Sequence, residues 1–416
     1  MSKDNLIKLK KPDVFVDDPI TDILRQGARK LLTQALEAEI EIFVHQYKDL
    51  VDELGRQRVV RNGYLPKREI QTGIGPVPVK APRVRDRSGQ SSDRVYFNSS
   101  ILPPYLRKTK SLEQLIPWLY LKGISTGDFT EALAALVGKG APGLSAPTIS
   151  RLKTGWEKDF QDWQKRNLSG KDYVYFWVDG IHCNVRMDDK QCLLVIIGAT
   201  RDGKKELVAI DGGFRESELS WTQLLMDIKS RGLEIGPKLC VGDGALGFWK
   251  AISQVYPDSR WQRCWVHKTA NVLNKIPKSI QPKAKEKLHE IWHADTKDDA
   301  ERHFDNFVQV YEAKYPKAVQ CLRKDREALL TFYEFPAEHW RHIRTTNPIE
   351  STFATVRLRT AKVRGCFSAT TVTTMAFKLC QCAEGRWIKL HHPERLAEVI
   401  KGVRFVNGIE ENRIAA

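Results

Sequence analysis

The chain has 416 residues, of which 42% are hydrophobic and 28% charged, so a disordered chain is excluded and two or three folded domains are expected. Lysine and arginine outnumber aspartate and glutamate by 67 to 51, a net charge of +16, which favours a nucleic-acid partner over a merely basic surface. No apolar run reaches the roughly 18 residues of a membrane helix, and the polar first residues show no signal peptide. With scattered cysteines and no CxxC pair, a reduced cytoplasmic protein is expected.

Residues 19–50 carry apolar side chains at helical spacing, with acidic residues on the other face. This pattern predicts an amphipathic helix that packs against a partner helix or protomer. Residues 56–110 are rich in lysine, arginine, proline and glycine, and the alternation from Ile70 to Val84 predicts a small β-hairpin on a basic loop. Contact with DNA phosphates is the functional interpretation of this segment, and a solvated charged surface is the alternative.

Residues 111–166 read as a series of short helices. Ser145 is placed to cap the third, with Pro147 tolerated in its first turn, and that helix carries Arg151 and Lys153. Two helices followed by a basic third helix are the outline of a helix-turn-helix, so Arg151 and Lys153 are candidate DNA-binding residues. Three helices that pack together without binding DNA are the alternative.

From residue 171 the pattern changes to strands and helices, which predicts a mixed α/β sheet. The expected strands are Tyr173–Val178, Ile181–Met187, Gln191–Thr200, Glu206–Asp211, Lys238–Val241 and Arg260–Val266, and the expected helices are Ser217–Arg231 and Leu246–Val255. No strand is expected in residues 268–340, which read as a helical insertion with helices at Ala284–Trp292, Asp299–Tyr315 and Ala318–Phe332. Helices are expected again at Asn347–Arg364 and Thr370–Trp387.

These patterns divide the chain into six consecutive regions. They are an N-terminal helical region (1–55), a basic β-hairpin and loop region (56–110), a helix-turn-helix-like region (111–168), the first part of an α/β core (169–267), a helical insertion (268–340), and the second part of the core with the C-terminal helices (341–416).

Two aspartates share one sequence context in the α/β region. Asp179 and Asp243 each follow an apolar strand and precede a glycine. Ligand sites of open α/β sheets gather at strand ends, and glycine permits close approach, although such aspartates also form ordinary turns. Glu350 is less distinctive, because Asn347 as helix cap, Pro348 as first helical residue and Glu350 as third would make a capping box. Capping and metal binding are compatible.

Three gathered carboxylates would have a clear chemical use. Two unit charges about 4 Å apart repel by roughly 4 kcal/mol at a surface-like dielectric, so such a group would take up protons or cations. Carboxylate oxygens suit Mg²⁺ or Mn²⁺. Two such ions activate an attacking oxygen and stabilise a leaving one in phosphoryl displacement.

The chain resembles the Mutator-type family of bacterial insertion-sequence transposases from about residue 19 to about 390. The resemblance rests on the order and spacing of short motifs: Val178-Asp179-Gly180, Gly242-Asp243-Gly244, Cys264-Trp-Val-His267 with Asn271, and Thr345-Thr-Asn-Pro-Ile-Glu350. Supporting stretches are Arg61-Asn-Gly-Tyr64, Ala81-Pro-Arg83, Leu119–Ser125 and Thr360–Gly365.

The resemblance implies a ribonuclease-H-like core interrupted by the helical insertion. It implies that Asp179, Asp243 and Glu350 form a catalytic triad that holds Mg²⁺ or Mn²⁺, with two ions expected. Cys264, His267 and Asn347 would lie near that site. A zinc site at Cys264 and His267 is not expected, because a second pair of ligands with suitable spacing is missing. Gly242 stands where many relatives have serine, which removes a hydroxyl beside Asp243.

The helix after Glu350 adds positive charge. Arg357 lies about two turns from Glu350 and so on the same face. Arg357, Arg359, Lys362 and Arg364 are therefore candidate DNA-binding residues, with a solvated basic helix as the alternative.

The function that follows is that of a DNA transposase, a cytoplasmic bacterial enzyme that associates with the nucleoid when bound to DNA. Its expected partners are double-stranded DNA, both transposon ends and target, and a second copy of the chain in a homodimer or larger homo-oligomer. The alternatives are a catalytically inactive DNA-binding regulator derived from a transposase, and a metal-dependent nuclease that lacks strand transfer.

Overall fold

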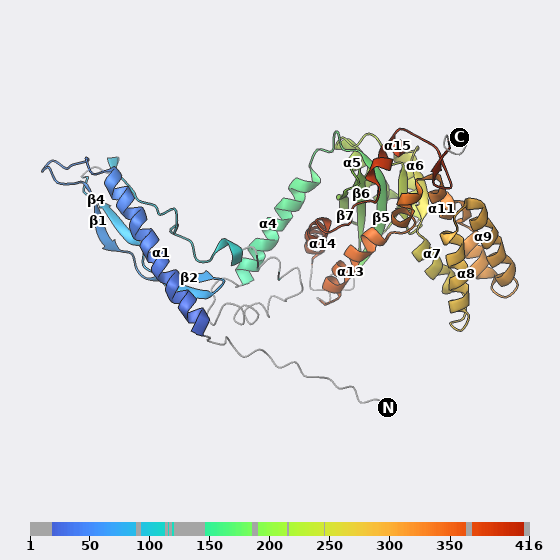
Figure 1. The fold of residues 1–416 in the computed structure, drawn as a ribbon, viewed down its shortest axis with the longest axis horizontal. Coiled ribbons are helices and arrows are strands. Elements are labelled where there is room, and N and C mark those ends of the chain that lie inside the picture. The colour runs from blue at the N-terminus through green and yellow to red at the C-terminus, as the bar shows by residue number, and fades with distance from the viewer. Residues whose placement is uncertain are drawn as a thin grey trace, which may run out of the picture. The chain divides into compact units, whose positions relative to one another are not determined.

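A computed structural model of the chain describes residues 19–88, 93–112, 115, 119, 146–184, 190–213, 216–244, 246–362 and 368–411. The chain divides into two compact units, Met1–Leu152 and Lys153–Ala416, each with its own core (Figure 1). None of the described helices is both long and apolar enough to cross a bilayer.

The N-terminal unit packs one long helix, α1, against short antiparallel strand pairs. The hairpin expected within residues 70–84 is confirmed, although it runs from Arg68 to Val79 and the next strand, β4, pairs with β1 instead. Leu36 on α1 shares a core with Ile70, Val77 and Leu102. Residue 55 is therefore no boundary between separate cores. The elements are α1 (Pro19–Gln46), β1 (Val59–Tyr64), β2 (Arg68–Thr72), β3 (Gly75–Val79) and β4 (Pro82–Asp86).

Several arginines of this unit have internal partners. Arg58 pairs at 2.8 Å with the buried Asp86 carboxylate, which holds the pKa of Asp86 down to about 2. Arg61 lies 2.8 Å from Glu37 on α1, and Arg68 donates to the carbonyl oxygens of Leu102 and Pro103. Part of the basic character of residues 56–110 is thus structural.

The expected helix-turn-helix is described only in its third helix, α4 (Ala146–Gln164), which carries Arg151 and Lys153. Ser145, the predicted cap, and most of the two preceding helices lie outside the described residues. From Lys153 on, α4 belongs to the second unit, where Asp159 accepts from Lys378 at 2.7 Å.

The second unit is built on a five-stranded mixed sheet with the order β7-β6-β5-β8-β9, which confirms the mixed α/β class. β5 is antiparallel to β6 and β6 to β7, whereas β5, β8 and β9 are parallel to one another. The strands are β5 (Tyr173–Asn184), β6 (Lys190–Thr200), β7 (Lys205–Gly213), β8 (Leu239–Gly242) and β9 (Arg260–Arg263).

Helices cover both faces of this sheet. On one face, α5 (Glu218–Ser230) and α6 (Leu246–Val255) bury Trp221 and Phe248 against Phe176 and Val178. On the other face, the Trp177 indole N–H donates to the carbonyl oxygen of His342 at 2.9 Å. The helices α13 (Asn347–Lys362) and α14 (Ala369–Glu384) pack there against β5 and β7. Because side chains alternate along a strand, Asp179 shares the face of Trp177.

Two strand predictions were wrong at their ends. β5 does not stop at Val178 but continues through Asp179 as one strand, because its antiparallel pairing with β6 extends to Asn184. The strand expected to reach Val266 ends at Arg263, and a helix starts at Trp265. Cys264 therefore lies at the start of a helix, not on a strand.

A helical segment separates the sheet from α13, as expected. Its elements are α7 (Trp265–Leu273), α8 (Gln281–His293), α9 (Lys297–Tyr311), α10 (Pro316–Arg323), α11 (Arg326–Leu330), the 3₁₀ turns η3 (Thr331–Glu334) and η4 (Ala337–His339), and α12 (Trp340–Ile343). The single helix predicted for Ala318–Phe332 is wrong. The chain breaks around Asp325, whose carboxylate turns back to pair with Lys268 and, at 3.2 Å, with Arg263. The chain ends in η5 (Pro393–Arg395), α15 (Leu396–Ile400), β10 (Phe405–Val406) and β11 (Ile409–Glu410).

Candidate active site

Asp179 lies within the central strand, one residue beyond the last parallel pair, Val178 with Gly242. Its side chain is 5% exposed. One carboxylate oxygen, Oδ1, accepts from the Gly180 N–H at 2.8 Å, while the buried Oδ2 has no hydrogen-bond partner among the described residues. A buried oxygen without a donor is costly, so this atom is suited to receive a cation or a proton.

Asp243 follows the end of β8 and is half-buried. Since Gly242 pairs with Val178, the two aspartates lie next to each other at the carboxyl end of the parallel strands. Burial, and after it the negative charge of Asp243, raise the pKa of Asp179 to about 6. Asp179 and Asp243 therefore occupy neighbouring positions on adjacent parallel strands, and their role as a site stays a prediction.

The glycine after each aspartate has a structural reason. Gly244 has φ +89°, and a Cβ there would stand 2.2 Å from Nη1 of Arg263. A Cβ on Gly180 would stand 2.8 Å from Oε2 of Glu216. In both places the close neighbour is a side chain of the same chain, so the absence of a Cβ leaves room for Arg263 beside Gly244 and for Glu216 beside Gly180.

Glu350 enters from the first turn of α13, which packs against β5. Its Oε1 accepts from the Thr346 hydroxyl at 3.2 Å and lies 3.7 Å from Nδ1 of His267. The helix includes Asn347, and the Thr346 carbonyl accepts from the Glu350 N–H at 3.1 Å. The predicted cap is therefore shifted by one residue, from Asn347 to Thr346, and Asn347 is exposed.

Cys264 and His267 form a hydrogen-bonded pair next to Glu350. Although burial opposes it, hydrogen bonds with His267 and Thr346 lower the pKa of the Cys264 thiol. The bond with Cys264, together with the charges of Asp179 and Glu350, raises the pKa of His267 to about 9. Donor atoms of Cys264, His267 and Glu350 all lie within 4.8 Å of one another. A protonated His267 thus links Glu350 electrostatically to Asp179.

The predicted basic residues are only partly described. Arg357 on α13 is exposed, and its guanidinium lies 5.9 Å from the centre of the Phe353 ring. Burial raises the pKa of Asp179, and the charge of Arg357 only partly opposes that rise. The side chains of Arg359 and Lys362 and the whole of Arg364 are outside the described residues. Arg151 is exposed and Lys153 half-buried on α4.

Glu216 was missed by the sequence prediction. Burial raises its pKa to about 7, and the charges of Asp243 and Asp179 add to that effect. The Trp221 indole N–H lies 3.4 Å from its Oε1. The local sequence, Arg-Glu-Ser-Glu before a helix, resembles an ordinary helix start, so nothing in it indicated a third acid beside the aspartates.

The fold and the site define a mixed α/β protein with an acidic cluster at the end of parallel strands, and comparisons with known proteins agree with the motifs there. Residues 2–388 match the sequence model of the family described as "Transposase, Mutator family". The chain belongs to this family, and it is a transposase.

Relatives support this assignment over most of the chain. The transposase for insertion sequence element IST2 of Acidithiobacillus ferrooxidans is 50% identical over 68% of this chain and 96% of its own length. The transposase for IS6120 of Mycolicibacterium smegmatis is 50% identical over 71% of this chain and 92% of its own length. The transposase for IS256 in transposon Tn4001 of Staphylococcus aureus is 30% identical over 73% of this chain and 76% of its own length.

Proposed function

We propose that the second unit is a ribonuclease-H-like catalytic core in which Asp179, Asp243 and Glu350 hold two divalent cations. The observation that carries the proposal is the buried, unpartnered Oδ2 of Asp179 beside a second carboxylate. Repulsion between the two carboxylates costs free energy in the cation-free protein. A cation between them would remove that cost, and its binding would be correspondingly favoured.

The donor atoms fit hard cations. Each of the three residues offers carboxylate oxygens, which suit Mg²⁺ or Mn²⁺ better than soft metals. Glu350 is fixed by the Thr346 hydroxyl and by His267, so the third ligand is oriented before any ion arrives. His267 therefore acts as a positioning residue, in the way that partners of metal ligands commonly do.

The reaction we propose is hydrolysis at the transposon ends, followed by attack of the freed 3′-hydroxyl on target DNA. The two bound cations would supply an activated attacking oxygen and stabilise the leaving one. The charge of Arg357 acts on Asp179, and we propose that its guanidinium binds the phosphate that reacts. Asn347, exposed at the start of α13, would face the same DNA strand.

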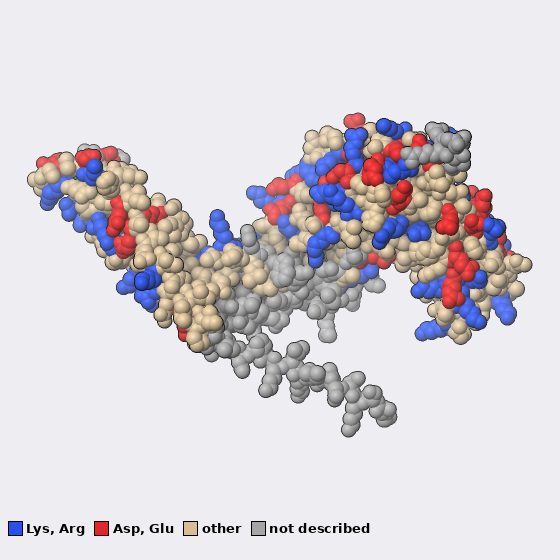
Figure 2. Space-filling view, viewed as in Figure 1, with Lys and Arg blue, Asp and Glu red and all other residues tan. Residues whose placement is uncertain are grey.

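DNA would be held by basic residues outside the acidic cluster. Lysines and arginines are spread over the surfaces of both units (Figure 2). In the N-terminal unit, Lys67, Arg83, Arg85 and Arg94 line one cavity together with the aromatic ring of Tyr96. Side chains of these kinds contact phosphates and stack on sugars or bases. We assign Arg151, Lys153, Arg359, Lys362 and Arg364 to the same role, and a homodimer or larger assembly would bring two ends together.

The test is a cleavage and joining assay on DNA that carries the element's ends. Full-length protein with Mg²⁺ or Mn²⁺ is expected to cut and join, and Asp179→Asn, Asp243→Asn and Glu350→Gln are each expected to lose both steps while still binding DNA. The matched controls are Asp258→Asn and Glu286→Gln, at exposed positions away from the cluster. Equal cutting by the three variants would refute the triad. A native protein that binds these ends but never cuts them would be a regulator.

A further inference from the structure

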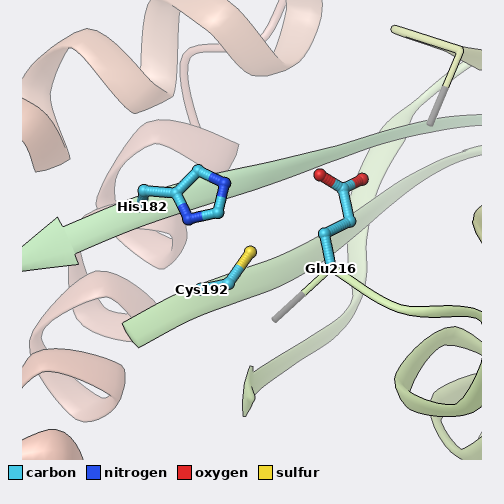
Figure 3. A group of neighbouring side chains, drawn as sticks. All are labelled: His182, Cys192 and Glu216. Carbon is cyan, nitrogen blue, oxygen red and sulfur yellow. The ribbon is translucent and has the colours of Figure 1, made fainter. Parts of the chain in front are cut away.

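A second group of metal-binding side chains lies on the opposite face of β5 from Asp179. His182 on β5, Cys192 on β6 and Glu216 before α5 point toward one another (Figure 3). Their nitrogen, sulfur and oxygen donors all lie within 4.8 Å of one another. Cys192 is buried, Glu216 is half-buried and His182 is exposed, so the group is closed on one side and reachable from solvent on the other.

The sheet register brings the first two residues together. His182 and Cys192 are direct partners in the antiparallel pairing of β5 with β6, so their side chains leave the same face at neighbouring positions. Gly180 precedes His182 by two residues and shares that face. A Cβ at Gly180 would lie 2.8 Å from Oε2 of Glu216 and 3.1 Å from Sγ of Cys192. The absence of a side chain there makes the space in which the three donors converge.

The three donor groups are held in place, and the described residues offer them few other partners. The Trp221 indole N–H lies 3.4 Å from Oε1 of Glu216 and orients that carboxylate. Within the part of the chain that the structure describes, the His182 ring and the Cys192 thiol have no hydrogen-bond partner, and the cysteines there are free thiols. A ligand oriented by a neighbouring N–H, next to two uncommitted donors, is typical of a metal site.

We propose that His182, Cys192 and Glu216 bind one borderline-soft transition-metal ion, with Zn²⁺ as the fitting example. One nitrogen, one sulfur and one carboxylate oxygen are ligands that zinc accepts, and a water would complete four-coordination. Sulfur and imidazole are poor ligands for Mg²⁺, so this site and the carboxylate triad would select different ions. The thiol proton of Cys192 leaves to solvent as the sulfur–metal bond forms.

Such an ion would have a structural consequence for the neighbouring cluster. It would join β5, β6 and the segment that leads into α5, on the face of β5 opposite the Asp179 side chain. It would also compensate the charge of Glu216, on which the charges of Asp243 and Asp179 act. This site does not depend on the proposed triad, because its ligands come from other residues and another face of the sheet.

The experiment uses the full chain, freed of metal by a chelator, dialysed, and titrated with Co²⁺ as a spectroscopic substitute for Zn²⁺. A sulfur-to-cobalt charge-transfer band is expected at one ion per chain, and added Zn²⁺ should remove it. Cys264→Ser separates this site from the other cysteine and histidine pair, and exposed Cys382→Ser is the matched control. Both variants should keep the band, whereas Cys192→Ser should lose it.

His182→Ala keeps the test valid if Cys192→Ser fails to fold, because His182 is exposed. It should weaken Co²⁺ binding at least tenfold without changing the circular dichroism of the apoprotein. The proposal is overturned if the native chain shows no band, if Cys192→Ser or His182→Ala binds as tightly as the native chain, or if Cys264→Ser alone removes the band. Mg²⁺-dependent cleavage is measured separately, so failure of the triad would be seen as a different result.

Discussion

Oε1 of Glu350 lies 3.7 Å from Nδ1 of His267, although a long helical segment separates the two residues in the chain. The same ring is affected by the charge of Asp179. His267 therefore connects an acid on α13 with an acid on β5. The helical segment is not only an insertion into the core, because its first helix, α7, supplies this contact.

Replacement of His267 tests that connection. His267→Gln removes the positively charged imidazole that interacts with both Glu350 and Asp179. It also leaves the Cys264 thiol without its main hydrogen-bond partner. We expect metal affinity, measured by Mg²⁺ titration of cleavage, to fall roughly 10- to 100-fold, as for other partners of metal ligands. The half-buried His303→Gln on α9 is the control, because His303 lies beside Glu290 and away from the acidic cluster. Loss of cleavage that excess Mg²⁺ does not restore would show that His267 does more than position Glu350.

Asp179→Asn should separate stability from activity. At pH 7.5 in the presence of a chelator, the buried Asp179 carboxylate is charged, because the pH lies above its pKa of about 6. The neutral asparagine of the same shape avoids burying that charge, so it should raise the melting temperature by roughly 2 °C or more. Mg²⁺ should raise the melting temperature of the native chain but not that of the variant. A variant less stable than the native protein in chelator would contradict the assigned repulsion between Asp179 and Asp243.

The pH dependence of stability follows from the same groups. The folded-state pKa values of Asp179 and Glu216, about 6 and about 7, lie above the ordinary values of these carboxyl groups, 3.8 and 4.5. The folded state therefore holds these protons more tightly, and the contribution of these two acids to the free energy of unfolding should fall as pH rises from about 4 to about 7, then level off. Thermal melts of the metal-free native chain and of Asp179→Asn/Glu216→Gln should show this fall in the native chain only. If the stability of the native chain and of the double variant depended on pH in the same way, these two acids would not be the source of the fall.

Gly244 is expected to be intolerant of any side chain. Gly244→Ala combines φ +89° with a Cβ 2.2 Å from Arg263, so we expect a loss of roughly 1–3 kcal/mol in stability and reduced cleavage through Asp243. Gly155→Ala is the matched control, since nothing lies within 4 Å of its Cβ. That change, within α4, should stabilise by up to about 1 kcal/mol. Denaturant unfolding measures both, and equal effects would refute the close approach of Arg263.

Arg357 should act on DNA rather than on folding. Its side chain is exposed, so Arg357→Gln should leave the melting temperature nearly unchanged. Loss of one phosphate contact should weaken DNA binding and reduce the salt dependence of affinity by about one charge. Binding of end-containing DNA at several salt concentrations measures this, with exposed Arg341→Gln on α12 as control. An unchanged salt slope would remove Arg357 from the DNA-binding surface.

The sequence alone determined the mixed α/β class and the family resemblance, and it singled out Asp179 and Asp243, because an apolar run followed by Asp-Gly is a local pattern. It located Glu350 only by resemblance, since a helix-capping residue has the same local appearance. The ends of strands at Asp179 and Cys264 were mispredicted, because pairing with β6 and the start of α7 are set by contacts with distant segments.

Only the tertiary structure decided what surrounds the aspartates. The register of β5 with β6 placed His182 opposite Cys192, and the bare backbone at Gly180 admitted Glu216. Packing of α13 on β5 and the turn into α7 brought Glu350 to His267. Such neighbours carry no local signal, because their side chains meet only after elements far apart in the chain have packed together. The sequence therefore identified the acidic residues, and the fold decided which basic, thiol and further acidic side chains lie next to them.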